Sequence, residues 1–338
     1  ALDAAADPRA ERFRADHRHA ATANLIRLSH AATVRDRLEA RGIPVVLLKG
    51  GAFVVRYAAA TPGIRPMSDL DWLVPANRFD DAAALLAREG FVRADARPWR
   101  AAPAVMATTF TKHDDLAMTI DIDLHRDVAQ WPYHRGLAAQ VLRGHEQVDG
   151  WRIPARPDAF AVAAVHRARH AFVWSCLDLV EVRLLLDDMD DAAWAACVAQ
   201  LTAVNAVGAA YATLRQALRV LGDTSPVDEA RLGSLAALLS RRRRTVLERL
   251  AQDDGPFLPP LAQERPLTRT FVVQPAVTGS WSQSLLAAAT HFPGRVAEEW
   301  RDARGSRRAR LGRIWHHVIG GARHAEAPEA RPPRSMQS

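Results

Sequence analysis

The sequence predicts an α+β protein, in which a small mixed sheet is flanked by helices and followed by a helical domain. Between residues 43 and 156, short apolar or alternating segments that are typical of strands are interspersed with helical segments. From Asp158 onward, apolar residues recur at helical spacing without a clear strand pattern. Hydrophobic residues make up 49% of the 338 residues, which is enough for a sizeable core.

The first predicted strand lies between two helices. Residues 8–41 carry apolar side chains at helical spacing, and the Gly-Ile-Pro run at residues 42–44 ends that helix. Residues 45–48 are wholly apolar, which is typical of a strand covered on both faces. A short helix is expected over residues 52–60, followed by a turn at residues 61–63.

The next part of the chain contains the other predicted strands. Residues 68–74 form a strand, and residues 79–89 form an amphipathic helix that ends at Gly90. Further strands are expected over residues 105–112, 116–124 and 151–154.

The predicted elements and the composition together divide the chain into four parts. The predicted helices of the C-terminal half cover residues 158–170, 177–186, 192–203, 207–221, one or two helices within 228–250, 282–289 and 297–304. We therefore expect a helical segment at residues 1–42, a sheet-containing domain at 43–156, a helical domain at 157–321 and a disordered basic tail at 322–338.

Charge and cysteine content restrict the classes of function. The net charge is +7 and the pI is about 10.3, which permits binding to phosphate-rich partners, including RNA. The arginine cluster at residues 241–244 is a candidate for such binding, but a solvated helix face is the preferred interpretation. No apolar run approaches the ~18 residues of a membrane span, and residues 1–17 lack the apolar region of a signal peptide. Cys176 and Cys197 form no disulfide framework, so we expect a cytoplasmic protein with reduced thiols.

Two aspartates separated by one residue are the strongest functional signal. Residues two apart in a strand project from the same face, so Asp69 and Asp71 are expected to lie side by side. Adjacent carboxylates repel each other unless a cation lies between them, and Mg²⁺ prefers carboxylate and phosphate oxygens. We predict that this pair binds Mg²⁺, with two ions expected and Mn²⁺ as a substitute. The alternative is a pair of solvated aspartates on an exposed strand.

A double glycine follows the first apolar strand. Gly50 and Gly51 permit close backbone approach, and the N-terminus of the following helix favours anions. We predict that they hold the phosphates of a nucleoside triphosphate, although an ordinary strand-to-helix turn has the same composition. Lys49 precedes them and is one of two lysines in the chain, so it is a candidate phosphate ligand. The alternative is that this lysine is a chance survivor at a strand end.

A third carboxylate is expected from a neighbouring strand. Alternation in residues 119–125 places Asp121, Asp123 and His125 on one face. Asp123 is the preferred third carboxylate and Asp121 is the alternative, acting as a general base on an acceptor hydroxyl or as a ligand of the catalytic metal. Either aspartate could instead be a solvated edge residue.

Four further residues have both a functional and a structural interpretation. Arg65 is a candidate for neutralising the charge of departing pyrophosphate, and Ser68 for donating a hydrogen bond to a phosphate; both could instead be surface residues. His166 and His170 share a helix face. They could line a substrate cleft, bind a metal or pack in the core, but the glutamate of an HExxH zinc motif is absent.

These motifs resemble those of the nucleotidyltransferase superfamily with the DNA polymerase β-like fold. Within it, the chain looks most like a bacterial group described as uncharacterised nucleotidyltransferases, over roughly residues 43–222. The resemblance rests on the apolar strand and Lys-Gly-Gly at Leu47–Gly51, the Arg-Pro-Met-x-Asp-x-Asp-x-Leu-Val segment at Arg65–Val74, Asp123-Leu124-His125, the spaced His166 and His170, and Asp178-Leu179.

The resemblance implies an enzyme that transfers a nucleoside monophosphate from a nucleoside triphosphate, with ATP favoured, and releases pyrophosphate. It implies a phosphate-loop role for Gly50 and Gly51, a metal-ligand role for Asp69 and Asp71, and a third-carboxylate role for Asp123. The second glycine stands where the superfamily usually has serine. A hydroxyl contact to phosphate is therefore missing or is supplied from elsewhere in the chain.

The group is often encoded in natural-product or surface-polysaccharide gene clusters, which implies a small-molecule, peptide or saccharide acceptor. One alternative is an RNA-directed nucleotidyltransferase, tRNA-modifying or toxin-like, that uses the basic C-terminal region. Another is a non-catalytic module that keeps the fold and binds a peptide or partner protein, although the cost of clustering carboxylates argues against it.

Overall fold

The computed structural model of the chain describes ten ranges of residues. They are 8–57, 63, 65–94, 106–113, 118–130, 132–170, 172, 176–222, 229–252 and 273–289. The helix expected over residues 297–304 and the tail expected over residues 322–338 lie outside these described residues.

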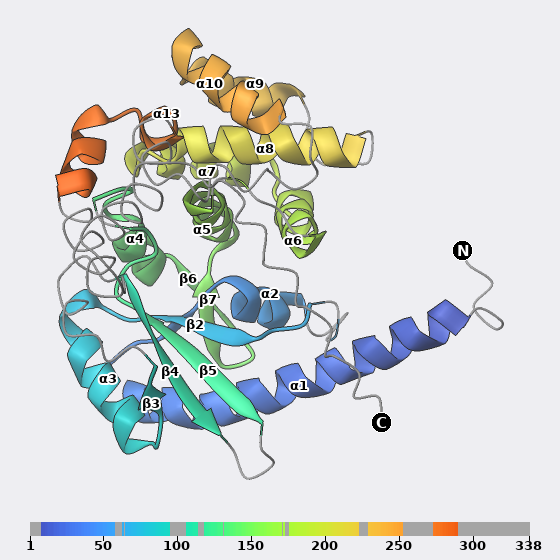
Figure 1. The fold of residues 1–338 in the computed structure, drawn as a ribbon, viewed down its shortest axis with the longest axis vertical. Coiled ribbons are helices and arrows are strands. Elements are labelled where there is room, and N and C mark those ends of the chain that lie inside the picture. Colours follow the sequence, from blue (N-terminus) through green and yellow to red (C-terminus); the bar gives the residue numbers. More distant parts are fainter. Residues whose placement is uncertain are drawn as a thin grey trace, which may run out of the picture.

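The described strands form one mixed sheet of seven strands in the order β3-β4-β5-β2-β1-β7-β6 (Figure 1). β2 pairs with β5 and β1 pairs with β7 in parallel, while the other neighbours are antiparallel. The α+β class is therefore confirmed. The strands are β1 (Val46–Leu47), β2 (Asp69–Leu73), β3 (Val92–Arg93), β4 (Ala107–His113), β5 (Thr119–His125), β6 (His145–Val148) and β7 (Trp151–Pro154).

The helices that precede or separate the strands are α1 (Pro8–Glu39), α2 (Lys49–Tyr57), a 3₁₀ turn η1 (Ala76–Arg78), α3 (Phe79–Arg88) and α4 (Leu137–Arg143). The later helices are α5 (Arg156–Arg169), α6 (Cys176–Asp187), α7 (Asp191–Ala203), α8 (Val207–Leu221), α9 (Glu229–Ala237), α10 (Arg241–Gln252), α13 (Gln274–Thr278) and a helix over residues 281–289. Among the described residues, none of these helices has the length and apolar character that crossing a membrane requires.

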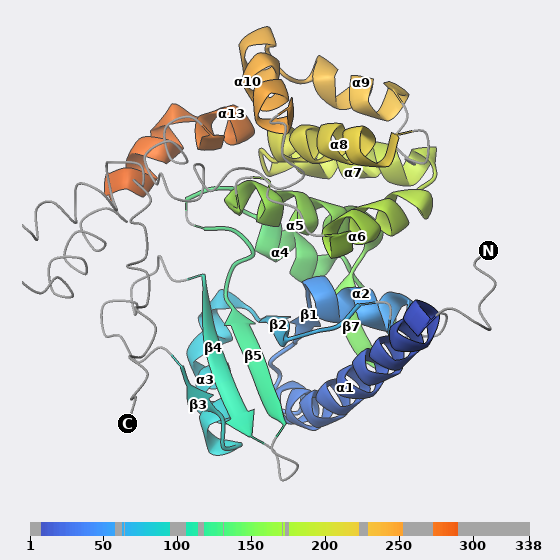
Figure 2. The ribbon, with the colours of Figure 1, turned by 45° about the vertical axis from the view of Figure 1, so that its right-hand side comes forward.

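Helices cover both faces of the sheet (Figure 2). Below the sheet, α1 and α3 pack Leu38 and Leu86 against Trp72 of β2 and Ile122 of β5. Above it, α4 to α8 bury a second cluster that reaches the sheet at Leu73 of β2. The upper face of β2 and β5 therefore lies between the sheet and the layer formed by α4 to α8.

Strand alternation decides which side chains face the upper helices. Ile120, Ile122 and Leu124 of β5 are buried in the lower core, as the alternation in the sequence predicts. Asp123 and His125 therefore project toward the helical side, where the two aspartates of β2 also lie.

Among the described elements, the strands β3 and β6 and the short helices α4 and α13 were not predicted. α4 and the edge strand β6 precede β7, and β6 turns into β7 at Asp149 and Gly150. Both turn residues have a positive φ, of 47° and 79°, as the two central residues of a type I′ hairpin turn require. The Asp-Gly pair is the sequence signal that identifies this hairpin, whereas β6 itself is polar and only partly buried.

Close packing between α8 and α13 gives a direct prediction for stability. A Cβ at Gly208 would meet the backbone carbonyl oxygen of Val277, which cannot move away as a side chain can. We expect Gly208→Ala to lower the free energy of unfolding by about 1–3 kcal/mol, measured by urea denaturation. The control is Gly233→Ala in α9, where a Cβ would meet nothing within 4 Å. That variant should gain up to about 1 kcal/mol, so an equal loss in both would contradict the packing argument.

Candidate functional site

The parallel pairing of β2 with β5 brings four aspartates together on one face of the sheet. Asp69 is the register partner of Asp121, and Asp71 is the partner of Asp123. Each strand holds its two aspartates two residues apart, so all four project to the same side. The sequence predicts each pair, but only the strand register shows which aspartates are opposite one another.

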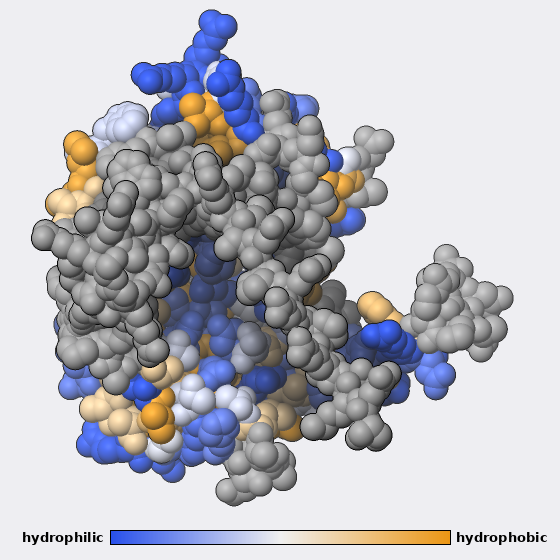
Figure 3. All heavy atoms as spheres, viewed as in Figure 1, coloured by the Kyte–Doolittle hydropathy of each residue, from blue (hydrophilic) through white to orange (hydrophobic). Residues whose placement is uncertain are grey.

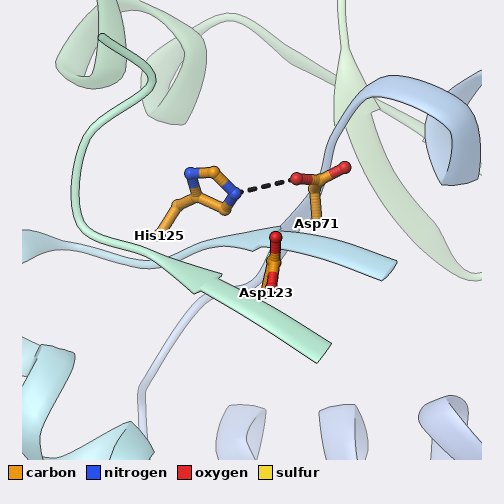
Figure 4. Close-up of side chains that lie close together, drawn as sticks. All are labelled: Asp71, Asp123 and His125. Carbon is orange, nitrogen blue, oxygen red and sulfur yellow. Dashed lines mark hydrogen bonds and ion pairs between the residues drawn. The ribbon is translucent and has the colours of Figure 1, made fainter. Parts of the chain in front are cut away.

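Two of these aspartates, Asp71 and Asp123, form a compact group with His125 that could hold a metal ion (Figure 4). One donor atom from each lies within 4.8 Å of the other two. The imidazole Nε2 of His125 lies 2.8 Å from Oδ1 of Asp71, and its Nδ1 lies 3.3 Å from the backbone carbonyl oxygen of Asp127. We assign the proton of the shorter bond to Nε2, so that His125 donates to the Asp71 carboxylate.

Asp71 is the buried, ionised centre of the group. Its carboxylate receives a second hydrogen bond from the Lys49 ammonium at 2.6 Å. Burial alone would raise the pKa of Asp71, but the hydrogen bonds and charges of His125 and Lys49 outweigh it and hold the pKa well below its usual range. Asp71 therefore carries a negative charge across the physiological pH range.

Asp69 lies at the edge of the same charged group. Its carboxylate accepts a hydrogen bond from the Ser68 hydroxyl at 2.9 Å. Burial and the negative charges of Asp71 and Asp123 raise the pKa of Asp69. Negative charges that raise the pKa of a neighbouring carboxyl in this way attract a cation, because a cation relieves the repulsion.

The two aspartates of β5 have equivalent neighbours on β4. Thr109 donates to the Asp123 carboxylate at 2.5 Å, and Thr111 donates to the Asp121 carboxylate at 2.6 Å. Only Asp123 belongs to the group with Asp71 and His125. Between the two alternatives that the sequence left open, the geometry therefore favours Asp123.

The double glycine lies in the first turn of α2 rather than in a loop. The helix begins at Lys49, which has a φ of 47°, a left-handed conformation that is uncommon for a residue with a side chain. A Cβ at Gly51 would lie 2.6 Å from Cδ1 of Leu47, and a Cβ at Gly50 would meet the Arg65 guanidinium. Packing therefore disfavours a side chain at Gly51, where Leu47 is fully buried, and at Gly50 a side chain would displace the Arg65 guanidinium. N–H groups of a first turn have no carbonyl partner within the helix, so this turn can also bind an anion.

Arg65 packs against the start of α2 but is not a free cation. Its guanidinium forms an ion pair with Glu181 of α6. Glu181 is itself buried, which raises the pKa of its carboxyl, while the charges of Arg65 and Arg167 lower it. The Arg65–Glu181 pair connects the segment before β2 to the helical layer.

A cleft between α2, α5 and α6 opens next to Lys49 and contains about 620 Å³, part of it open to solvent. Phe53 and Tyr57 of α2 contribute one aromatic wall, with their ring centroids 4.7 Å apart. Figure 3 shows a hollow between the sheet and the helices whose visible floor is hydrophilic. Each cation lining the cleft has a carboxylate partner: Lys49 with Asp71, Arg56 with Glu146, Arg65 with Glu181, and Arg167 with Asp178.

His166 lines this cleft, one turn of α5 before His170, and the two rings lie 4.5 Å apart. Burial, together with the charges of Lys49 and His170, lowers the pKa of His166 to about 2. His166 is therefore neutral at physiological pH. Of the interpretations that the sequence allowed, the structure supports the cleft-lining one for His166.

The donor atoms of the carboxylate group fit a hard divalent cation. Asp71 and Asp123 offer oxygen ligands, which Mg²⁺ prefers, and Asp69 adds a third carboxylate along β2. His125 offers nitrogen and already donates to Asp71, so it fits better as a group that orients that carboxylate. Alternation in the sequence predicts the correct strand face for His125 but indicates no role for it in the site.

A family model supports the chemistry that this geometry indicates. The model, described as uncharacterised nucleotidyltransferase, matches residues 2–222, which is more than half of the chain. The match includes every strand of the described sheet and the four aspartates. No match is found among the curated proteins. The chain belongs to the family of uncharacterised nucleotidyltransferases.

Proposed function

We propose that this protein transfers a nucleoside monophosphate from an Mg²⁺-bound nucleoside triphosphate to an acceptor and releases pyrophosphate. ATP is the favoured donor. The observation that carries the proposal is the register of β2 and β5, which sets Asp71 opposite Asp123 beside the first turn of α2. Carboxylates of two strands beside an anion-binding helix start form the combination that nucleotidyl transfer requires.

The aspartates take distinct roles in this proposal. Asp69, Asp71 and Asp123 would hold Mg²⁺, with two ions expected and Mn²⁺ as a substitute. When bound, Mg²⁺ neutralises phosphate charge and favours ionisation of an acceptor hydroxyl. Asp123 would also accept the proton of that hydroxyl. His125 and Thr109 hold two of these carboxylates in orientation through hydrogen bonds.

Binding of the triphosphate is assigned to the start of α2. The N–H groups of Gly50 and Gly51 and the Lys49 ammonium form the core of this proposed subsite. Lys49 contacts the Asp71 carboxylate in the structure, so it stands between the carboxylates and the cleft. Arg65 and Ser68 complete the proposed subsite. In the structure Arg65 pairs with Glu181 and Ser68 donates to Asp69, so each would share or exchange its partner on binding phosphate.

The acceptor class and its binding region also belong to this proposal. We expect a small-molecule, peptide or saccharide acceptor, used in a biosynthetic pathway of the cytoplasm. The domain proposed at residues 157–321 would recognise it, because α5 and α6 form the cleft wall opposite the sheet domain at residues 43–156. The N-terminal segment at residues 1–42 supports the sheet from below through α1.

The test is transfer of label from each of the four α-³²P-labelled nucleoside triphosphates into fractionated cell extract with Mg²⁺. We expect one nucleotide to label one class of acceptor, and Asp71→Asn and Asp69→Asn to lose at least about 10²-fold of the activity. Asp187→Asn, an exposed residue of α6, is the matched control that should keep it. Full activity in both Asp69 and Asp71 variants would overturn the proposal.

The same experiment separates the two competing functions. Label in RNA would favour the RNA-directed alternative. That alternative relies on the arginine cluster at residues 241–244, but Arg243 there donates to the backbone carbonyl oxygens of Ala276 and Val277. At least one arginine of the cluster is therefore structural. No label with any nucleotide, together with no binding of Mg²⁺–nucleotide, would favour the non-catalytic binding module.

A further inference from the structure

Arg169, at the end of α5, is a half-buried cation close to the carboxylate group. Its guanidinium makes one described contact, with the thioether sulfur of Met106 at 3.9 Å. No described carboxylate forms an ion pair with it, in contrast to the four cleft cations, each of which has a carboxylate partner. A thioether is a weak acceptor, so most of the five guanidinium N–H groups remain available to another anion.

The order of strands places Arg169 on the opposite flank of the carboxylates from Lys49. Lys49 follows β1, which is one neighbour of β2, whereas β5 is the other neighbour. Met106 directly precedes β4, and its carbonyl oxygen accepts the N–H of Arg126 just after β5. Arg169 therefore reaches the β4–β5 flank, beyond Asp123, while Lys49 and the start of α2 occupy the β1 flank.

Electrostatics agree with this position. Burial lowers the pKa of the Arg169 guanidinium, and the charges of Asp123 and Asp71 counteract that effect. Both carboxylates thus affect the Arg169 guanidinium electrostatically, although neither forms a described ion pair with it. An ammonium or guanidinium that is partly desolvated without a contacting anion is costly, so this position suits a residue that is neutralised by a ligand.

A guanidinium binds the two oxygens of a carboxylate, or two oxygens of a phosphate, through paired hydrogen bonds that lie in the guanidinium plane. If the triphosphate occupies the start of α2, the anion at Arg169 belongs to the other substrate. We propose that Arg169 binds a phosphate or carboxylate group of the acceptor, so that acceptors of this protein are anionic. This inference rests on the proposed function, and in particular on placing the triphosphate on the β1 flank.

The test is calorimetric titration of inorganic phosphate, and separately of acetate, into the full chain saturated with Mg²⁺ and α,β-methylene-ATP. Wild type should bind one of these anions, and the preferred one identifies the acceptor group as phosphate or carboxylate. Arg169→Gln should weaken that binding about tenfold or more. Arg183→Gln, at an exposed arginine of α6, is the matched control and should change it by less than about twofold.

The affinity for the ATP analogue separates this inference from the proposed function. Arg169→Gln should leave that affinity within about twofold of wild type, whereas a large loss would place Arg169 in the triphosphate site and overturn the inference. Unchanged anion binding in Arg169→Gln, or no anion binding by wild type, would also overturn it. A wild type that does not bind the analogue contradicts the proposed function instead, and the anion titration repeated with Mg²⁺ alone then tests Arg169 independently.

Discussion

Asp123→Asn is expected to lower nucleotidyl transfer by about 10³-fold or more, because asparagine removes the metal-binding charge and the proton acceptor that the proposed function assigns to Asp123. Interactions of a catalytic metal contribute several kcal/mol, and each 1.36 kcal/mol changes the rate tenfold. Asp123 lies in the group with Asp71 and His125, within 4.8 Å between donor atoms. The measurement is the rate of pyrophosphate release at saturating Mg²⁺ and nucleotide.

Asp121→Asn is a closely matched control for this prediction. Asp121 lies two residues away on the same face of β5 and accepts one hydrogen bond from Thr111, just as Asp123 accepts one from Thr109. The two variants should therefore lose similar stability, but Asp121→Asn should lose less than about tenfold in rate. A greater loss in Asp121→Asn than in Asp123→Asn would assign the third carboxylate to Asp121, which the sequence left as the alternative.

The second large effect is a loss of stability in mild acid that depends on His134. Its ring is buried, and Nδ1 lies 3.3 Å from the carbonyl oxygen of Val204. Burial lowers the pKa of His134 to about 4 in the folded protein, against about 6.5 in the unfolded chain. Between these two pKa values the unfolded chain binds a proton that the folded protein does not. The contribution of His134 to the free energy of unfolding is therefore complete above pH 6.5 and is lost as the pH falls toward 4.

Replacement of His134 should remove this dependence. The pKa of His134 differs by about 2.5 units between the folded and unfolded states, which corresponds to about 3 kcal/mol. Between pH 7 and pH 4, the free energy of unfolding should therefore fall by about 3 kcal/mol more in wild type than in His134→Asn. Asparagine suits the φ of 49° at this position. The measurement is urea denaturation at a series of pH values, and parallel curves for the two proteins would contradict the assignment.

The strand faces at the site could be predicted because they depend on local chain geometry. Alternation along residues 119–125 places Asp121, Asp123 and His125 on one face, and the structure confirms that Ile120, Ile122 and Leu124 occupy the other. The register between β2 and β5 could not be predicted in this way. It depends on packing between segments that are about fifty residues apart in the chain, and a shift of two residues would pair different aspartates without changing either face.

The double glycine shows a contact that the local sequence pattern does not predict. The sequence pattern predicts phosphate binding for Gly50 and Gly51, yet the structure gives each glycine a packing reason that no local pattern reveals. Leu47 fills the space beside Gly51, and the Arg65 guanidinium fills the space beside Gly50. The proposed phosphate-binding role is compatible with the packing role, because the first turn of α2 packs against Leu47 of β1 and also presents N–H groups that have no carbonyl partner within the helix.

By itself, the sequence determined the α+β class, the order of most strands and helices, and the aspartates that share strand faces, because periodicity and turn residues are local properties. Tertiary structure alone decided that Asp71 faces Asp123, that Lys49 and His125 bind the same carboxylate, and that Arg169 from α5 approaches the opposite flank. Each of these contacts joins segments far apart in the chain, so it follows from how the sheet and the helices pack rather than from any short run of residues.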